Sequence, residues 1–293
     1  MLAPSERYQR RRGHRHKGVL DWSRQMVALL HRWHPERALV VVADSQFAAL
    51  EWLHACRGRA AVVTRLRLDA ALYAPAPLRG PRTRGRPRLK GARLPTLAVA
   101  CADARTAWTS LTIPTWYGAR PRTVEVASQT AVWYHGGLPP VPIRWVLIRD
   151  PQGGFADQAL LCTDQAAAPL AIVTWFVQRW QMETTFEEAR AHLGVETQRQ
   201  WSDRAIARTT PALLGLFSLV TLLARQLLGE QPCPTRAAAW YHKPEPTFSD
   251  TLALVRRHLW TRTTFRLSPA CPDAQQVPPA LADHLAELLC YAA

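Results

Sequence analysis

Hydrophobic residues near the N-terminus switch between two periodicities. Apolar side chains recur at three-to-four spacing after Asp21, which predicts a helix that begins at this capping residue and ends before Pro35. The valine-rich run 38–44 predicts a strand buried on both faces, residues 47–56 a second helix, and residues 60–66 a second buried strand. This β–α–β order favours a parallel pair with a right-handed crossover.

The pattern changes in the middle of the chain. Residues 74–95 are rich in proline and arginine and show no period, which predicts a loop or a mobile arm. Residues 107–163 are strand-like and are divided by glycine and proline turns, which predicts an antiparallel β insertion of about four strands.

Helical periodicity dominates the remaining sequence. It extends over residues 169 to about 193 and returns over 210–228, 249–260 and 279–291, with Ser249 as the expected cap of the third helix. The apolar run Pro211–Ala224 is too short to span a bilayer, so we expect a buried helix there and no membrane partner.

Charge is concentrated in one part of the 293 residues. The chain has 37 Lys+Arg against 22 Asp+Glu, a formal net charge of +15. Residues 1–93 hold 20 basic and 6 acidic residues (net +14), whereas residues 94–293 hold 17 and 16 (net +1). A basic region of this kind indicates a polyanionic partner such as nucleic acid. The alternative is an arginine bias from a GC-rich coding sequence, since only three of these residues are lysine.

Cysteine usage and the N-terminal sequence bear on the compartment. The six cysteines form no C-x-x-C pair and have no histidine at zinc-ligand spacing. The N-terminal sequence lacks the apolar segment of a signal peptide. We therefore expect reduced, mostly buried thiols in a cytoplasmic protein.

Two acidic residues are candidates for chemistry. Asp44 closes the first buried strand, and ligands of open α/β sheets bind outside the carboxyl ends of strands. An aspartate there also serves as a helix cap, and for Asp44 alone the two interpretations weigh equally. Further along, a single helical stripe would carry Phe176, Arg179, Glu183, Glu187 and Arg190. Ordinary Arg–Glu surface pairs explain part of that stripe.

Phe176-x2-Arg179-x3-Glu183-x6-Arg190 resembles the Tyr-x2-Arg-x3-Glu-x6-Lys signature of bacterial insertion-sequence DDE transposases. Phenylalanine replaces the tyrosine and arginine replaces the lysine. Three further features support the resemblance, which covers roughly residues 1–260. They are VVVADS around Asp44, the β-rich segment between the two acidic residues, and the sequence around and after Glu183, RWQMETTFEEARAHLGVETQRQWSDRAIARTTPALLGL.

The resemblance implies DNA cleavage and strand transfer by two-metal phosphoryl transfer on an RNase H-like domain. Asp44 matches the family's second acidic residue and Glu183 its third, so both would be catalytic ligands of Mg²⁺. Phe176, Arg179 and Arg190 would belong to the DNA-binding signature. The partners would be double-stranded DNA, as transposon ends and target, and a second copy in a homodimer. The basic arm would add these DNA-binding residues: Arg82, Arg84, Arg86, Arg88 and Lys90.

Aromatic residues of the β insertion are candidates for stacking on a displaced base, with a core role as the more frequent alternative. They are Trp116, Tyr117, Trp133, Tyr134 and Trp145.

The family's first aspartate has no counterpart in this sequence. Only about 20 residues precede the first long helix, and none of them is aspartate. Asp21 opens the helix itself and does not substitute. We therefore expect an N-terminally truncated transposase with an incomplete RNase H-like fold that lacks the first strands, has an exposed sheet edge, and neither cuts nor joins DNA alone.

These interpretations divide the chain into four parts. Residues 1–68 would be the first part of the RNase H-like domain, 69–165 the basic arm and β insertion, 166–230 the second part with the glutamate helix, and 231–293 a C-terminal helical region. Two alternatives stay open. One is a non-catalytic DNA-binding remnant or inhibitor, and the other is a basic α/β protein of different purpose, in which Asp44 and Glu183 lie far apart.

Overall fold

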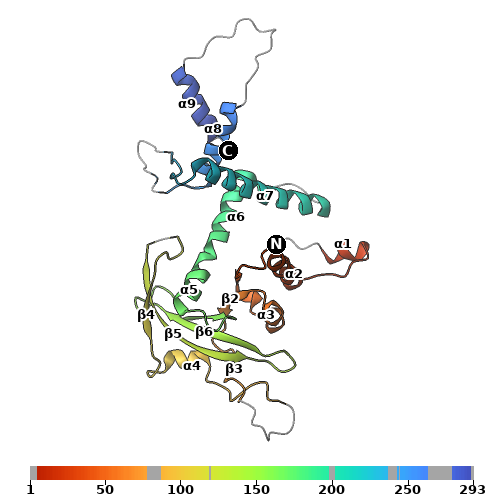
Figure 1. Ribbon diagram of the computed structural model, residues 1–293, viewed down its shortest axis with the longest axis vertical. Coiled ribbons are helices and arrows are strands. Elements are labelled where there is room, and N and C mark those ends of the chain that lie inside the picture. Colours follow the sequence, from red (N-terminus) through yellow and green to blue (C-terminus); the bar gives the residue numbers. More distant parts are fainter. Residues whose placement is uncertain are drawn as a thin grey trace. The chain divides into compact units, whose positions relative to one another are not determined.

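The computed structural model describes residues 5–77, 87–118, 120–197, 202–236, 243, 245–262 and 279–291. Two compact units divide the chain: the sheet unit, Met1–Gln181, and the helical unit, Met182–Ala293 (Figure 1). Each is described by itself.

The sheet unit contains one curled mixed sheet with short helices. Its helices are α1 (Glu6–Arg11), α2 (Val19–Trp33), the 3₁₀ turn η1 (Ser45–Phe47), α3 (Leu50–Cys56), α4 (Leu97–Ala102) and α5 (Pro169–Gln178). Its strands are β1 (Val40–Val42), β2 (Ala61–Leu66), β3 (Leu72–Tyr73), β4 (Thr109–Ile113), β5 (Arg122–Trp133), β6 (Val141–Arg149) and β7 (Gln158–Cys162).

Strand order in this sheet is β1-β2-β7-β6-β5-β3, with β4 paired to β5. The parallel pair β1–β2 confirms the predicted β–α–β unit, and β4 to β7 confirm the four antiparallel strands. These four strands do not form a separate insertion, because β7 pairs with β2 through Val63 and Cys162. β1 pairs only with β2 among the described residues, so one of its edges is open, as expected.

The sheet separates two hydrophobic cores. One core packs α3 and α4 on one face and contains Leu53 and Leu161, which are both fully buried. The other core packs α5 on the opposite face, through Ile172 and Phe176 (Figure 1). Burying both faces stabilises the sheet and explains the mostly apolar sequences of β2 and β7. The prediction that β1 is buried on both faces is wrong, because this edge strand has Val40 37% exposed and Val41 and Val42 only half-buried.

The first long helix forms as predicted but faces differently. Gly18 precedes α2, and Asp21 stabilises the start from within the first turn, where its Oδ2 accepts the Gly18 N–H at 3.2 Å. Val27 faces the core, whereas Met26 and Trp33 of the apolar stripe are 47% and 62% exposed. Periodicity therefore located the helix but not its buried face.

The ends of the basic segment are anchored rather than loose. Ala74 N–H donates to the Ala92 carbonyl at 2.8 Å, and Leu94 N–H donates to the Leu72 carbonyl at 2.9 Å. Gly91 is required in this pairing, because a Cβ there would lie 2.5 Å from the Pro75 carbonyl oxygen. The predicted mobile arm is thus a paired stem where the structure describes it.

The predicted helix over 169–193 is two helices. α5 ends at Gln178, and α6 runs over Trp180–Leu193. Arg179 lies between them, and its N–H donates to the Phe176 carbonyl at 3.2 Å, three residues back. The stripe from Phe176 to Arg190 is therefore interrupted at its second member.

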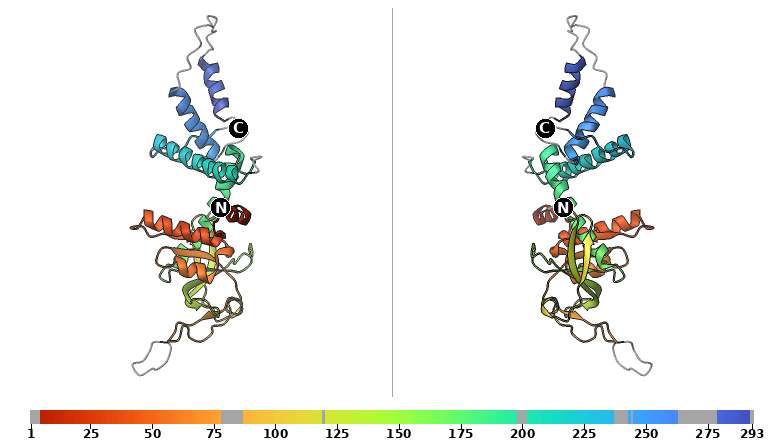
Figure 2. Two further views of the ribbon diagram at one scale, coloured as in Figure 1. Left: turned by 90° about the vertical axis from the view of Figure 1, so that its right-hand side faces the viewer. Right: turned by 90° about the vertical axis from the view of Figure 1, so that its left-hand side faces the viewer.

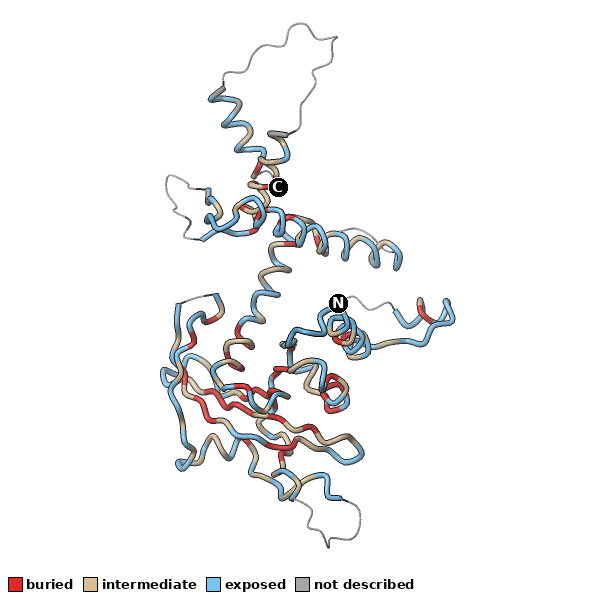
Figure 3. Tube along the Cα trace, viewed as in Figure 1, coloured by how far each residue is buried: buried red, intermediate tan, exposed pale blue. Residues whose placement is uncertain are grey.

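The helical unit contains α7 (Asp203–Leu228), α8 (Phe248–Arg262) and α9 (Pro279–Cys290), and α8 and α9 lie side by side (Figure 2). The prediction of a buried apolar helix is wrong for α7, where Leu219 and Leu222 are 58% and 63% exposed (Figure 3). By length and composition alone, α7 is also apolar enough to cross a membrane.

Cysteine thiols in the described residues are free, as expected. Cys56, Cys162 and Cys290 are buried, and burial raises the pKa of the Cys162 thiol to about 11. Cys271 lies outside the described residues.

Candidate active site

Asp44 lies immediately beyond β1, at the carboxyl end of the parallel pair. Ala43 continues the ladder by donating its N–H to the Val63 carbonyl at 2.9 Å. The Asp44 backbone is extended, and its side chain caps η1 because Oδ1 accepts the Gln46 N–H at 2.9 Å. The residue is exposed, and Oδ2 has no partner among the described residues. The cap and a ligand role are therefore compatible, since each needs one oxygen.

Thr64 fixes the backbone of Asp44 from the neighbouring strand. Its hydroxyl donates to the Asp44 carbonyl at 2.5 Å, and the Thr64 side chain is fully buried. Sequence reasoning missed this residue, because the contact depends on the β1–β2 register. A threonine inside an otherwise aliphatic strand was the available signal.

Strand alternation places Asp44 and Arg65 on the face of the sheet that α5 covers. Val42 pairs with Val63, and both contact the α5 core. Residues two further along a strand point to the same side, so Asp44 and Arg65 continue these two positions. Arg65 is exposed and was also missed, because nothing local distinguishes it from other surface arginines.

Two guanidinium groups lie over the ring of Phe176. The Arg65 and Arg179 Cζ atoms are 5.7 Å and 6.0 Å from its centroid. Phe176 is 3% exposed, so its placement favours a supporting role over the direct DNA contact that the signature implied. A buried aromatic face that holds two cations makes a local anion-binding surface on the side of the sheet to which Asp44 also belongs.

An aromatic cavity of about 460 Å³ adjoins this surface at Arg65. Trp116 stacks on Phe155 at a centroid distance of 5.4 Å, and Arg122 lies 5.5 Å and 5.2 Å from the centroids of these two rings. Arg122 also pairs with Asp150, whose side chain is buried. Packed this way, Trp116 is 9% exposed and contributes mainly to the core.

The loop that carries these aromatics is tightly constrained. Tyr117 adopts a left-handed φ of 48°, which is uncommon for a tyrosine. Gly118 follows with φ 75°, and a Cβ there would lie 2.5 Å from the ring of Trp180. The loop thus packs against the residue that follows Arg179.

The other aromatics proposed for base stacking differ in exposure. Trp145 is 6% exposed in the α3–α4 core, which favours the core alternative. Trp133 and Tyr134 are half-buried at the end of β5, where Tyr134 packs edge-on to Tyr73 at 6.2 Å.

The described part of the basic arm presents two of its predicted DNA contacts. Arg88 is exposed. Lys90 is half-buried, with its Nζ 3.4 Å and 4.5 Å from the ring centroids of Tyr73 and Tyr134. The remaining expected contacts lie outside the described residues: Arg82, Arg84 and Arg86.

Glu183 and Arg190 belong to the helical unit. Glu183 is exposed in the first turn of α6, where the helix dipole favours a carboxylate. Arg190 pairs with Glu196, whose Oε2 accepts from Nε at 3.0 Å, so its guanidinium is already engaged. His192 makes a 3.4 Å contact with Glu188, consistent with an ordinary helix-surface residue.

Carboxylate oxygens are the donors that Mg²⁺ prefers, and the exposed Asp44 suits such a role. Within the described ranges, however, no three His, Cys, Asp or Glu side chains gather closely enough to hold a metal ion. A donor set for a two-metal centre is therefore not assembled among these residues.

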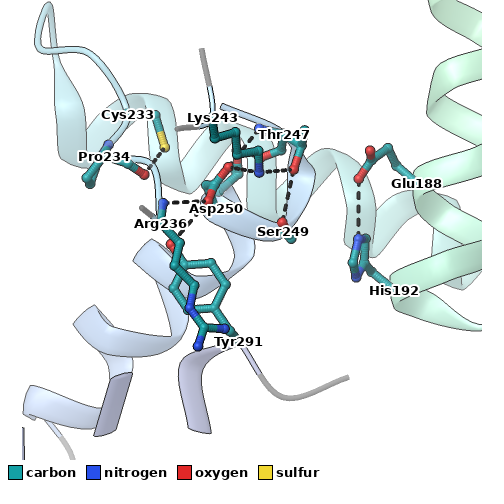
Figure 4. A network of polar contacts seen from close by, with 11 residues as sticks. Glu188, His192, Cys233, Pro234, Arg236, Lys243, Thr247, Ser249, Asp250 and Tyr291 are labelled. Carbon is teal, nitrogen blue, oxygen red and sulfur yellow. Dashed lines mark hydrogen bonds and ion pairs between the residues drawn. The ribbon is translucent and has the colours of Figure 1, made fainter. Parts of the chain in front are cut away.

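Asp250, in the helical unit, accepts several hydrogen bonds (Figure 4). It is 1% exposed and accepts from Lys243 Nζ at 2.5 Å, the Thr247 N–H at 2.9 Å and the Tyr291 hydroxyl at 3.1 Å. Burial raises its pKa, but the bond from Lys243, together with those from the Thr247 and Arg236 N–H groups, lowers the pKa on balance. At the start of α8, the bond from the Thr247 N–H to Asp250 is the capping interaction, whereas Ser249 was the predicted cap. The T-x-x-D spacing of Thr247 and Asp250 is the sequence signal for this cap.

Residues 2–137 match the profile of the DDE superfamily endonucleases. The matched segment, slightly under half of the chain, contains Asp44 and does not reach Glu183. This match supports a DDE transposase-like domain and suggests a nuclease or transposase-like function with DNA as substrate. The superfamily generally uses divalent metal ions. No curated protein sequence matches the chain.

Proposed function

We propose that this chain is the catalytic part of an insertion-sequence transposase, with an RNase H-like fold, that acts on DNA through a divalent-metal site to which Asp44 and Glu183 contribute. The observation that carries the proposal is the position of Asp44. It presents a free carboxylate oxygen at the carboxyl end of the parallel strand β1, inside the segment that matches the endonuclease profile.

The residues around Asp44 have separable roles in this proposal. Thr64 holds the Asp44 backbone, and Oδ1 caps η1, which leaves Oδ2 as the ligand for a metal ion. Arg65 and Arg179, over the buried ring of Phe176, bind a DNA phosphate beside the carboxylate. A bound divalent ion would supply Lewis-acid stabilisation of phosphoryl transfer.

We further propose that the chain alone binds metal weakly and does not cut DNA. The described residues before β1 form helices α1 and α2, so they present no strand that could carry a third carboxylate beside Asp44. Losing one member of a catalytic carboxylate set reduces rates by orders of magnitude.

The test is Mn²⁺ titration by calorimetry on the wild type, Asp44→Asn and Glu183→Gln. We expect each variant to lower the affinity at least about tenfold, as removal of a ligand does. Asp69→Asn is the matched control, because this exposed aspartate pairs with Arg67. Equal Mn²⁺ affinity for the wild type and Asp44→Asn would remove the site from consideration.

A nicking assay on supercoiled DNA with Mg²⁺ then separates the two parts of the proposal. No cleavage by the wild type is the expected result. If the wild type cleaves DNA and Asp44→Asn abolishes the cleavage, the transposase function is supported. The proposal that the chain alone does not cut DNA is then wrong.

A non-catalytic DNA-binding remnant is the second candidate. The lack of a three-ligand group in the described residues favours it. It predicts DNA binding that is indifferent to both Mn²⁺ and Asp44→Asn, whereas the first proposal predicts that Mn²⁺ strengthens DNA binding of the wild type only.

A further inference from the structure

A basic cavity of about 610 Å³ lies in the sheet unit, away from the signature residues. Three separate segments line it: the 15–17 loop, the first half of α2, and the turn before β2. Its cationic side chains are Arg15, Lys17, Arg24 and Arg59, and Asp21 is the one carboxylate among its lining residues. None of the four cationic side chains belongs to a sequence motif described above.

Neutral groups of the chain accept the hydrogen bonds of Lys17 and Arg59. Gln9, which is 6% exposed, accepts the Lys17 N–H at 3.0 Å and contacts His16 Nδ1 at 3.0 Å, which fixes the loop. Lys17 Nζ donates to Gln25 at 3.1 Å, and Arg59 donates to the Ala55 carbonyl at 2.7 Å. Neutral acceptors orient the side chains without cancelling their charge.

Asp21 offsets one of the four positive charges of this cavity. Its Oδ2 already accepts the Gly18 N–H, and its Oδ1 is 3.4 Å from the Arg24 guanidinium, at the long end of a hydrogen bond. Arg15 has no carboxylate partner in the described part of the chain, and it is exposed. The cavity therefore retains a net positive charge.

A second cavity of about 470 Å³ shares Arg59 with the first and extends the basic surface. Arg37 and Arg57 line it, together with His31 at the end of α2, and Asp164 is its one acidic side chain. Across both cavities, six cationic side chains face two carboxylates.

We propose that this two-cavity surface binds consecutive phosphates of the DNA backbone, at the end of the β1–β2 pair opposite Asp44. Arg59 precedes β2, whereas Asp44 is level with Arg65, so six residues at about 3.3 Å each separate the two ends by roughly 20 Å. Since B-DNA advances about 3.4 Å per base pair, a duplex whose axis follows the strands would span this separation in about six base pairs.

A row of backbone phosphates fits better than a single small anion. The cations are spread over two adjoining cavities rather than converging on one point, and five of the six are arginines, whose planar forks suit phosphate oxygens. This inference rests on the proposed function, because it takes DNA as the substrate.

The experiment measures binding of a fluorescent duplex at several salt concentrations. The variants are Arg15→Ala/Lys17→Ala/Arg24→Ala and, separately, Arg59→Ala. Removing three phosphate contacts should lower the slope of log affinity against log salt by about 2.7, and the single change by about 0.9. Arg67→Ala/Arg105→Ala is the matched control, because these exposed arginines pair with adjacent aspartates. This control should change the slope of log affinity against log salt by less than the triple variant and by less than Arg59→Ala.

The outcomes are distinct. A wild-type protein that does not bind duplex DNA would overturn the proposed function. Wild-type binding with an unchanged slope in both variants would overturn the surface and leave the function standing. If inorganic phosphate, at the same phosphate concentration as the duplex, displaces the duplex from the wild type, the site takes a single anion and the inference is wrong. Circular dichroism checks folding, and Arg15→Gln alone provides a solvent-exposed change if the triple variant does not fold.

Discussion

The sheet unit and the helical unit are stabilised in different ways. The sheet unit buries two aliphatic cores, one on each face of a seven-stranded sheet. The described helical unit has one small cluster, with Val220, Ala224, Phe248 and Val255 as its buried members. Its long helix α7 presents leucines that are mostly exposed. Hydrophobic burial therefore supports the first unit, whereas the second depends more heavily on polar contacts.

The sheet unit and the helical unit present different kinds of residues. A rigid sheet holds Asp44, Thr64 and Arg65 in fixed register, which a catalytic or binding constellation requires. The helical unit presents Glu183 from the first turn of α6, and Asp250 is the one buried acid among its described residues. Disrupting each unit should therefore have different signatures.

The largest expected effect is in the sheet core. Leu161 is fully buried, and Leu161→Ala should lower the free energy of unfolding by about 3 kcal/mol or more, through lost burial and the cavity left behind. Leu222→Ala on α7 is the matched control, because the same atoms are removed from a side chain that is 63% exposed. Urea unfolding measures both. A loss above about 1 kcal/mol for Leu222→Ala would show that α7 is covered in solution and would break the comparison.

The next effect concerns Asp250. Asp250→Asn removes the charge that pairs with Lys243, whose side chain is 19% exposed, so we expect a loss of about 2–3 kcal/mol in the helical unit. Hydrogen exchange should show faster opening of α8 and α9 with no change in β5 to β7. Equal protection in both proteins would mean that the network is not what orders this unit.

The pH dependence of the same network has two opposite limbs. The folded pKa of Asp250 is lowered, so its contribution is present above its unfolded value near 4 and is lost as pH falls through the folded pKa. Burial and the neighbouring Asp250 charge raise the pKa of Tyr291 to about 12. That contribution is present below about pH 10 and is lost as pH rises from 10 toward 12. Tyr291→Phe should remove the alkaline limb of unfolding and leave the acid limb.

Local sequence signals predicted elements better than they predicted pairings. The valine-rich runs located β1 and β2 to within about two residues, because a short apolar run can be recognised from residues adjacent in sequence. The junction of β2 with β7 joins residues nearly a hundred positions apart, so no local pattern revealed that the two parallel strands and the four antiparallel strands share one sheet.

The candidate site divides along the same line. The place of Asp44 at a strand end could be predicted because a strand end is a local feature, and its role as a ligand stays a prediction. Thr64 and Arg65 were missed because they matter only through register. Phe176 was assigned to DNA by the signature, whereas its burial beneath two arginines depends on how α5 packs on the sheet.

A smaller effect tests the precision of the sheet unit. Thr64→Val removes the bond to the Asp44 carbonyl and should cost about 1 kcal/mol, the net value of a typical hydrogen bond. Because that carbonyl fixes the loop, Mn²⁺ affinity should fall further than stability predicts. Thr130→Val, at an exposed position on β5, controls for the substitution itself. Unchanged Mn²⁺ affinity in Thr64→Val would show that metal binding does not depend on the bond that Thr64 makes to the Asp44 carbonyl.

The smallest effect compares one ion pair from each unit. Arg190 and Glu196 are 54% and 62% exposed, so Arg190→Gln should cost about 0.5 kcal/mol or less. Arg149 and Glu125 are 37% and 30% exposed on paired strands, and Arg149 also lies 4.0 Å from the ring centroid of Trp108. Arg149→Gln should therefore cost more, about 1 kcal/mol, because the fixed strands have already ordered both side chains. Double-mutant cycles at low and high salt measure both pairs. A larger coupling energy for the α6 pair would mean that the helical unit is the more rigid of the two, opposite to what its packing implies.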